Sequence, residues 1–460
     1  MRGSHGWAEV SRERKRDIIE AIVANKPTKG PVHAELDLTD RCNVACYFCN
    51  QQDLRTKDSI PLPKLTDLID ELAEGGLKSV RLSGGGDPLF HRDVVNVMDH
   101  LAKRNVIIDN VTTNGVALTN DVATRLVNGN AREVIFSLNA VDAADYARMM
   151  QVKPALFDKV LANIRNLVAV RGDSMYPSIV LQFLIDKKNV DRIVDMYELG
   201  RSLGPDRIAI NAVLEIPFER IDYSVLLSLD DNLIAEPQIE EILRRDMDAR
   251  LLQIDFPYPQ WNEMLQRTRQ RVGTVPHNNF PVAKSFKGEN GGCFFAWYSA
   301  AITGNGDIRP CCLMLNPTVK PLGNVHDTPK FADHWNGPAF QKMREEMREV
   351  LLMKSKKPYS PQRFEILKEQ CVAPHMCYLK TMYFQGDEQF YSELDDALTK
   401  MRKKEVNLVF GDNTARKRAI ELYVQEHPRV KKAWDWFREN SRPTRVFLKQ
   451  RLGINLTDAV

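Results

Sequence analysis

The feature that most constrains the fold of this 460-residue chain is a regular alternation of short strand-like runs with amphipathic helical segments. The strand-like runs lie near residues 33–38, 78–82, 107–111, 132–137, 178–185 and 207–213. Neighbouring parallel strands need long crossover connections, usually helices, so the alternation predicts an α/β fold with a parallel sheet. Six strand–helix units fall short of a fully closed barrel, and we therefore expect a partial (β/α)6 barrel.

The chain divides into five segments with different patterns. We expect an N-terminal helical cap (1–32), the partial barrel (33–216), an insertion or connector (217–290), a cysteine-bearing domain (291–384) and a basic helical C-terminal extension (385–460). The connector is identified by a charged helical stretch and by the proline-aromatic segment FPYPQW, which together interrupt the strand–helix alternation.

Composition and charge exclude several classes of protein. Hydrophobic residues make up 43% and charged residues 27% of the chain, which is ordinary globular usage and excludes collagen-like and wholly disordered chains. No apolar run approaches the roughly 18 residues of a membrane-spanning helix, and the first residues lack the apolar core of a signal peptide. We therefore expect a cytoplasmic protein without a membrane partner.

The cysteines are clustered, with a long cysteine-free interval between the first group and the others. The first group is a C-x3-C-x2-C loop, formed by Cys42, Cys46 and Cys49, directly after the first predicted strand. In a reducing compartment such clusters indicate metal binding or catalysis rather than disulfides. Three thiolates can hold three irons of a cubane cluster and leave the fourth iron open, and a zinc site is the alternative.

With the aromatic Phe48 before its last cysteine, this loop resembles the radical S-adenosylmethionine (SAM) superfamily, whose open iron chelates the amino and carboxylate groups of SAM. The resemblance implies a TIM-type barrel, a SAM-binding [4Fe-4S] cluster on Cys42, Cys46 and Cys49, and SAM as cofactor. It also implies a 5′-deoxyadenosyl radical that removes hydrogen from a substrate, as in an oxidoreductase or lyase. An external one-electron reductant of the flavodoxin or ferredoxin type is then needed.

Polar motifs follow further predicted strands and match positions where the family contacts SAM. These residues are Ser83, Gly84, Gly85, Gly86, Asp87, Thr113, Asn114, Ser137 and Asn139, and Phe48 of the cysteine loop is expected to contact SAM with them. The carboxyl ends of parallel strands form the active face of such barrels, so we expect these residues to gather there. Taken singly, the glycine run and either asparagine also fit ordinary turn chemistry.

The second cysteine group follows the pattern C-x12-G-x4-C from Cys293 to Cys311, with a predicted hairpin turn at 303–307. It resembles the SPASM and twitch extensions of radical SAM enzymes. Downstream, Cys371 and Cys377 supply only the middle pair of the full SPASM motif. The resemblance therefore implies one auxiliary [4Fe-4S] cluster, held by Cys293, Cys311, Cys371 and Cys377.

The role of Cys312 and the identity of the metal stay open in this group. Cys312 either replaces Cys311, contacts substrate or is a buried inert thiol. A structural zinc site would use the same four cysteines. We leave His334 and His375 out of the ligand set, because a lone histidine is more often a hydrogen-bonded or surface residue.

The expected substrate is a small polar molecule, such as an aminoglycoside, aminocyclitol or sugar-like intermediate, that undergoes dehydrogenation, epimerisation or dehydration. The 32 residues before the first strand are too few for a peptide-binding domain, and related twitch enzymes of antibiotic biosynthesis act on such compounds. The candidate substrate-side residues are Gln182, Asn211, Glu215, Arg309 and Cys312. A peptide-modifying SPASM enzyme is one alternative, and a non-catalytic iron–sulfur or zinc protein is another.

The C-terminal extension is rich in lysine and arginine interleaved with tryptophan, a pattern that also suits single-stranded nucleic acid. However, Val430, Ala433, Trp434 and Phe437 are helically spaced, which favours packing of an apolar face and a solvated basic face. We therefore expect no nucleic-acid partner.

Overall fold

The computed structural model describes residues 7, 10–49, 51–52, 55–213, 223–247, 249–256, 259–274, 294–311, 320–352 and 387–411. The chain forms two units, Met1–Tyr391 and Ser392–Val460. In the described part of the first unit, one sheet has the strand order β10-β9-β8-β1-β2-β3-β4-β5-β6-β7. The predicted parallel α/β sheet is thus confirmed.

Seven consecutive parallel strands run from β1 to β7 in the sheet. Their bounds are β1 (His33–Leu36), β2 (Ser79–Leu82), β3 (Ile107–Thr113), β4 (Glu133–Ser137), β5 (Ser178–Ile185), β6 (Arg207–Ala212) and β7 (Leu252–Asp255). The first six coincide with the predicted strands. The seventh lies in the segment that we expected to interrupt the barrel, so the alternation continues there. A strand of four residues is too short to show a period-two pattern in the sequence.

The C-terminal part of the first unit adds to the same sheet on the other side of β1. Strand β8 (Ser299–Ile302) pairs parallel with β1, and β9 (Asp307–Arg309) returns antiparallel beside β8, followed by β10 (Gly323–Asn324). The hairpin predicted at 303–307 is confirmed, with Thr303 N–H donating to the Asp307 carbonyl at 3.0 Å. Gly306 has a φ of 88° in this turn, a conformation that favours glycine.

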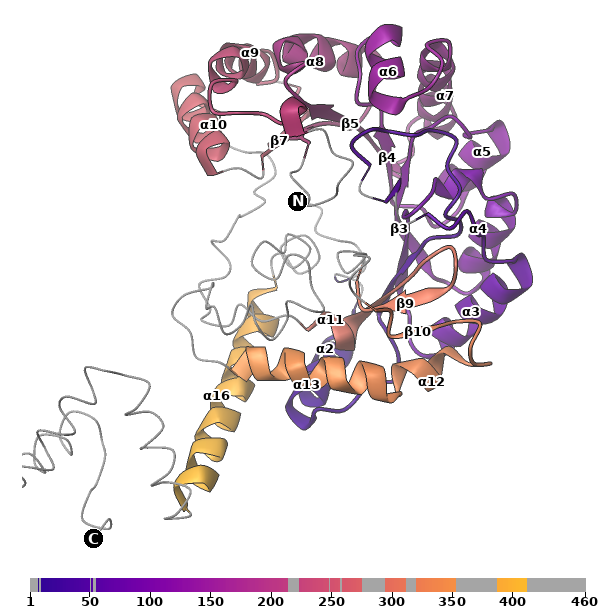
Figure 1. Cartoon of the computed structure of the whole chain (residues 1–460), viewed down its shortest axis with the longest axis vertical. Helices are drawn as coiled ribbons and strands as arrows, with labels where there is room; N and C mark the ends of the chain where they lie inside the picture. Colours follow the sequence, from indigo (N-terminus) through magenta and orange to yellow (C-terminus); the bar gives the residue numbers. More distant parts are fainter. Residues whose placement is uncertain are drawn as a thin grey trace, which may run out of the picture. The chain divides into compact units, whose positions relative to one another are not determined.

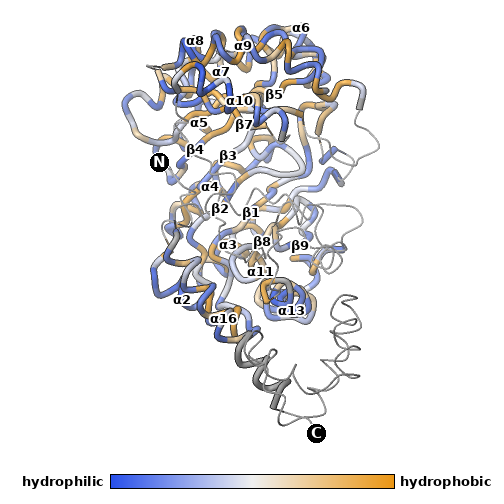
Figure 2. The backbone as a smooth tube through the Cα atoms, turned by 90° about the vertical axis from the view of Figure 1, so that its left-hand side faces the viewer, coloured by the Kyte–Doolittle hydropathy of each residue, from blue (hydrophilic) through white to orange (hydrophobic). Residues whose placement is uncertain are grey.

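Helices α3 to α10 cover the outer side of the sheet (Figure 1). The bounds of the described helices are α2 (Arg12–Ala24), α3 (Leu62–Glu74), α4 (Val94–Lys103), α5 (Asn120–Asn128), α6 (Ala143–Met150), α7 (Leu156–Arg171), α8 (Ile193–Ser202), α9 (Asn232–Arg245), α10 (Pro259–Val272), α11 (Phe295–Tyr298), α12 (Phe331–Trp335), α13 (Pro338–Leu352) and α16 (Glu388–Gly411). Short 3-10 turns are η2 (Pro88–Phe90), η3 (Val190–Arg192) and η4 (Tyr223–Val225). Hydrophilic and hydrophobic residues alternate along these helices (Figure 2), as expected for helices with one face on a sheet.

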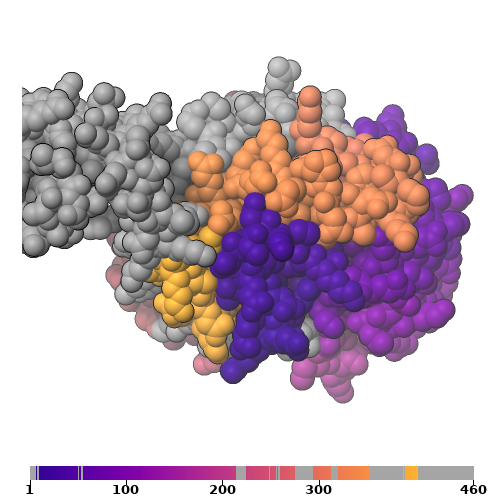
Figure 3. Space-filling view, turned by 90° about the horizontal axis from the view of Figure 1, so that it is seen from below, coloured from indigo at the N-terminus to yellow at the C-terminus, as the bar shows by residue number. Residues whose placement is uncertain are grey.

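Helix α2 lies near the amino ends of β1 and β8. The Trp297 indole donates to the Lys26 carbonyl at 2.9 Å, and Thr28 donates to the Trp297 carbonyl at 3.0 Å. The Gln341 amide of α13 donates to the Asn25 carbonyl at 3.0 Å, and Figure 3 shows the N-terminal and α13 segments side by side. This helix therefore sits at the end of the sheet away from the cysteine loop, which follows the carboxyl end of β1.

The C-terminal extension is represented by α16, and the basic clusters beyond residue 411 lie outside the described residues. Within the part of the chain that the structure describes, none of the helices has the length and apolar character needed to cross a membrane.

Candidate active site

Four polar segments meet at the carboxyl ends of β1 to β4, as expected for parallel strands. The Asn114 amide after β3 lies 3.7 Å from the Cys42 sulfur and donates to the Asn43 side chain at 2.7 Å. After β4, the Asn139 amide lies 3.8 Å from the Met150 sulfur, which is itself 3.6 Å from the Cys46 sulfur. The structure thus brings together motifs that are far apart in the sequence.

The cysteine loop is anchored on the carboxyl end of α6. Ala45 N–H donates to the Met150 carbonyl at 3.0 Å, and Tyr47 N–H donates to the Met149 carbonyl at 3.3 Å. The last carbonyls of a helix have no partner within the helix, so a loop that supplies N–H groups satisfies them and is fixed in return. Cys46 is buried by this arrangement, whereas Cys42 and Cys49 are half-buried.

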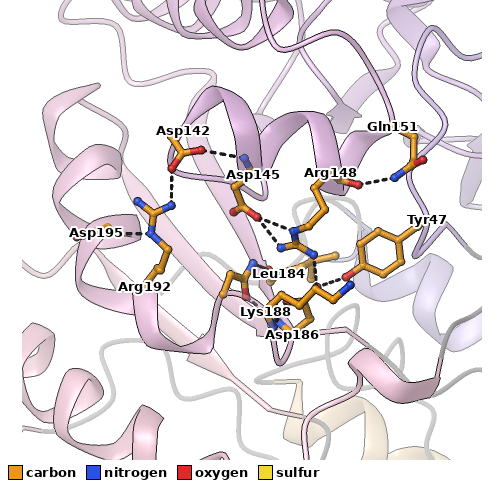
Figure 4. Close-up of polar contacts among 11 residues, drawn as sticks. Tyr47, Asp142, Asp145, Arg148, Gln151, Leu184, Asp186, Lys188, Arg192 and Asp195 are labelled. Atoms are coloured by element: carbon orange, nitrogen blue, oxygen red, sulfur yellow. Dashed lines mark hydrogen bonds and ion pairs between the residues drawn. The ribbon is translucent and has the colours of Figure 1, made fainter.

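A buried carboxylate strengthens this anchor (Figure 4). The Tyr47 hydroxyl donates to Asp186, which follows β5 and is fully buried. Arg148 of α6 forms an ion pair with the same carboxylate at 2.8 Å. Burial, followed by the negative charge of Asp186, raises the pKa of Tyr47, so the phenol stays a neutral donor. The Tyr47 side chain therefore links the cysteine loop to α6 and to the end of β5.

The glycine run after β2 packs directly on the segment that leads into the cysteine loop. Gly86 N–H donates to the Thr39 carbonyl at 3.1 Å, and Asp87 N–H donates to the Arg41 carbonyl at 3.0 Å. A Cβ atom on Gly84 would lie 1.7 Å from the Asp37 carboxyl carbon, and one on Gly86 would lie 2.0 Å from the Arg41 carbonyl oxygen. The absence of side chains at these glycines is thus a packing requirement.

Asp87 fastens the glycine run to the end of β3. Its buried carboxylate accepts hydrogen bonds from Thr113 at 2.9 Å, from Asn114 N–H at 2.7 Å and from Leu89 N–H at 2.9 Å. Burial raises the pKa of Asp87, while these donors act in the opposite direction. In this structure Asp87 and Thr113 hold two loops together, and Asn114 is the member of the group whose side chain faces the cysteines.

Ser137 is the last residue of β4, and Asn139 lies two positions beyond it. Asn139 is 1% exposed and has a φ of 59°, and its side-chain oxygen has no hydrogen-bond partner in the described part of the chain. Burying an unpaired amide oxygen is costly, so such an atom indicates that a ligand donor is missing. A SAM molecule on the cysteine loop fits this requirement, because its amino and hydroxyl groups are donors.

The thiols of the loop need positive partners to exist as thiolates. Burial raises the pKa of Cys42 and of Cys46, whereas the Arg55 guanidinium lowers both. Among the described residues, no group of three or more His, Cys, Asp or Glu side chains is placed to hold one metal ion. A cubane cluster makes a different demand, because each thiolate binds a separate iron. Three thiolates on one loop are a donor set of the kind that holds an iron–sulfur cluster.

Of the second cysteine group, only Cys311 is described. It follows β9 and is buried. Cys293, Cys312, Cys371 and Cys377 lie outside the described residues, as does His375. His334 has an ordinary structural environment, with its ring nitrogen 3.0 Å from the Thr328 hydroxyl. The auxiliary cluster and its ligands remain a prediction.

The hairpin turn between β8 and β9 contacts the first site. Gly304 N–H donates to the Asp40 carboxylate at 3.2 Å, and Thr56 donates to the same carboxylate at 2.7 Å. A Cβ atom on Gly304 would lie 2.3 Å from the Asp40 nitrogen. The C-terminal hairpin therefore supports the chain two residues before Cys42.

The predicted substrate-side residues are only partly brought together. Gln182 of β5 and Asn211 of β6 are half-buried, and the register Gln182–Ala209 and Leu184–Asn211 puts both on one face of the sheet. Arg309 lies in β9, across β1 in the strand order, and pairs with Asp307 at 3.9 Å. Glu215 lies outside the described residues.

Sequence reasoning missed a belt of polar side chains within the strands. It comprises Glu35, Arg81, Asn110, Thr112, Glu133 and Arg207. Arg81 lies 4.0 Å from the Glu35 carboxylate and donates to Thr112 at 3.4 Å. Asn110 donates to Glu133 at 3.1 Å, and Glu133 also pairs with Arg207. The available signal was a charged residue inside an otherwise apolar strand, as in Ser-Val-Arg-Leu of β2.

Comparisons with known proteins agree with this geometry. The family model of the radical SAM superfamily matches residues 36–200, and the SPASM model, an iron-sulfur cluster-binding domain, matches 293–361. PqqA peptide cyclase of Gluconobacter oxydans is 30% identical over 182 residues, which cover 39% of this chain and 49% of that protein. A probable GTP 3',8-cyclase of Methanocaldococcus jannaschii is 26% identical over 49% of this chain and 76% of its own length. The chain spans about half the length of the first curated relatives it matches.

Two solved structures share the fold. Streptococcus suis SuiB bound to precursor peptide SuiA has a TM-score of 0.52 and 16% identity, over 75% of this chain and 77% of that one. The protein anSMEcpe with bound AdoMet has a TM-score of 0.50 and 12% identity, over 84% of this chain and all of that one.

Proposed function

Because this chain belongs to the radical SAM superfamily and carries a SPASM iron–sulfur domain, we propose that it is an enzyme that uses SAM to remove a hydrogen atom from a polar substrate inside the barrel. The observation that carries the proposal is the meeting of the three-cysteine loop with Asn114 and Asn139 at the carboxyl ends of the strands. The cofactors are iron–sulfur clusters and SAM.

We assign the first cluster to Cys42, Cys46 and Cys49. Together with SAM, this cluster supplies a 5′-deoxyadenosyl radical when one electron is delivered from outside. The backbone of the glycine run and the Asn114 and Asn139 side chains would bind and orient SAM. The unpaired oxygen of Asn139 supports a donor from SAM at that position. The apolar cluster of Val213 and Leu226, with Phe48 and Leu184 against it, would keep water from the reacting groups.

The substrate is proposed to be small and polar, of the aminocyclitol or sugar type. The polar belt does not decide the substrate class, because Glu133 and Arg207 begin their strands at the amino ends and the belt groups pair with one another. What supports a polar substrate is the pair Gln182 and Asn211, which are half-buried amides on one face of β5 and β6 nearer the carboxyl ends of these strands. Amide side chains of this kind would recognise a molecule with several hydroxyl or amino groups and reject an apolar one, since unpaired polar groups are costly.

A peptide substrate is the second candidate, favoured by the similarity to PqqA peptide cyclase. For either substrate we propose one auxiliary [4Fe-4S] cluster on Cys293, Cys311, Cys371 and Cys377. A flavodoxin- or ferredoxin-type protein would deliver the electron, and the cytoplasm is the proposed compartment because it keeps the thiols reduced.

The experiment is an anaerobic label-transfer assay. Aminocyclitols and sugars deuterated at one ring carbon are incubated with protein, SAM and dithionite, and deuterium in 5′-deoxyadenosine is measured by mass spectrometry. Transfer from one labelled ring position is the expected result, with the Cys42/Cys46/Cys49→Ala protein as the blank. Turnover of a precursor peptide, without transfer from any sugar or aminocyclitol, would replace the first candidate by the second.

A further inference from the structure

Arg55 is a residue near the cysteine loop to which the proposed function gives no role. It lies six positions after Cys49 and is half-buried. Its guanidinium donates to the Cys49 sulfur at 3.3 Å, to the Val44 carbonyl at 3.4 Å and to the Gly85 carbonyl. The planar fork of arginine is suited to such divergent acceptors, which a lysine reaches only one at a time. Arg55 thereby links the cysteine loop to the glycine run.

The charge of Arg55 has no carboxylate partner in the described part of the chain, since its acceptors are two carbonyls and a sulfur. The Arg55 charge also acts on the buried carboxylate of Asp87, but that carboxylate takes its hydrogen bonds from Thr113, Asn114 and Leu89. Among the hydrogen-bond acceptors of Arg55, the Cys49 sulfur is therefore the one that carries a negative charge as a thiolate.

We propose that Arg55 is a positioning residue that holds the Cys49 thiolate and places a positive charge beside the first cluster, which raises the reduction potential of that cluster. Hydrogen bonds to ligand sulfurs and local net charge are two main determinants of iron–sulfur potentials. A cation stabilises the one-electron-reduced state, which is the more negative, over the oxidised state. The inference rests on the proposed cluster at Cys42, Cys46 and Cys49.

The test compares full-length wild type with R55Q and R55K after anaerobic reconstitution. The midpoint potential of the first cluster is measured by redox titration with an external low-potential mediator, followed by electron paramagnetic resonance. The signal that changes on addition of SAM identifies this cluster. A matched control is R92Q, which removes one positive charge from a side chain that is 86% exposed.

The expected result is a more negative midpoint potential in R55Q, a potential nearer to wild type in R55K, and no shift in R92Q. Equal potentials in wild type and R55Q would overturn the inference. If R55Q assembles no first cluster, R55K decides: a retained cluster with a near-wild-type potential supports the role of the charge, and loss of the cluster in both variants overturns it. Absence of the cluster from wild type would instead refute the proposed function.

Discussion

The substitution Gly86→Ala tests whether the glycine run sets the position of the first cysteine. The new Cβ would lie 2.0 Å from the Arg41 carbonyl oxygen and 2.6 Å from that of Thr39. Both are backbone atoms, so no flexible side chain can move away. Because real Cβ contacts essentially never fall below 3.0 Å, the Arg41 carbonyl has to move by about 1 Å or the glycine run has to bend.

Movement of the Arg41 carbonyl would also displace Cys42, because Arg41 immediately precedes this cysteine. It also strains the hydrogen bonds of Gly86 N–H to Thr39 and of Asp87 N–H to Arg41. Overpacking of this kind typically costs about 1–3 kcal/mol of unfolding free energy. A shift of about 1 Å in a positioning segment can lower a rate by about 100-fold. We expect G86A to fold with reduced stability and to cleave SAM about 100-fold more slowly.

The assay measures iron after anaerobic reconstitution and 5′-deoxyadenosine formed under dithionite. The matched control is Gly75→Ala at the end of α3, where φ is −68° and the nearest contact of a new Cβ would be 3.2 Å. We expect G75A to stay within about two-fold of wild type, since overpacking there is slight. A G86A protein with wild-type iron content and wild-type SAM cleavage would refute the packing argument.

Three further predictions concern other parts of the site. Burial, with Glu35 and Asp40 nearby, raises the pKa of Asp37 well above its ordinary value, so the folded state keeps a proton that the unfolded state loses. The contribution of Asp37 to the free energy of unfolding is complete below its unfolded pKa and falls as pH rises toward its folded pKa, by at most about 1.4 kcal/mol per pH unit. In denaturant titrations of the apoprotein, D37N should make the free energy of unfolding fall less steeply with pH. Equal pH slopes in wild type and D37N would contradict this prediction. Y47F removes the hydrogen bond from Tyr47 to Asp186 that anchors the cysteine loop, so the first site should retain less iron during gel filtration. Iron retention equal to that of wild type would contradict this prediction. Reconstituted wild type should bind about eight irons and the Cys42/Cys46/Cys49→Ala protein about four, and zinc or about twelve irons would contradict the assigned ligands.

The parts of the fold that could be predicted are those whose signal is local. Six strands and the hairpin at 303–307 show up as apolar runs and a Gly-Asn-Gly turn, and the structure has them. Strand β7 (Leu252–Asp255) was missed because its four residues stand between a charged helix and a proline-rich segment. Its place in the sheet depends on pairing with β6, which no local pattern encodes.

The candidate site was predictable to the level of motifs but not of contacts. The sequence puts Asp87 next to the glycine run, yet only the fold shows its carboxylate engaged by Thr113 and Asn114. Arg55 carries no motif, and its contact with Cys49 depends on the loop conformation. The polar belt was missed because Arg81 and Glu133 lie on β2 and β4, which are not neighbours but both pair with β3. Only the register of these pairings shows that the two side chains lie on the same face of the sheet.

The most direct test of the central claim is the reductive cleavage of SAM by the full-length protein and by its Cys42/Cys46/Cys49→Ala variant. After anaerobic reconstitution with iron and sulfide, both proteins are incubated with SAM and dithionite, and 5′-deoxyadenosine is quantified. The account predicts formation of 5′-deoxyadenosine by wild type and none by the variant, since the open-iron site is gone while the β/α core does not depend on it. Persistent 5′-deoxyadenosine in the variant would contradict the assignment of the active site.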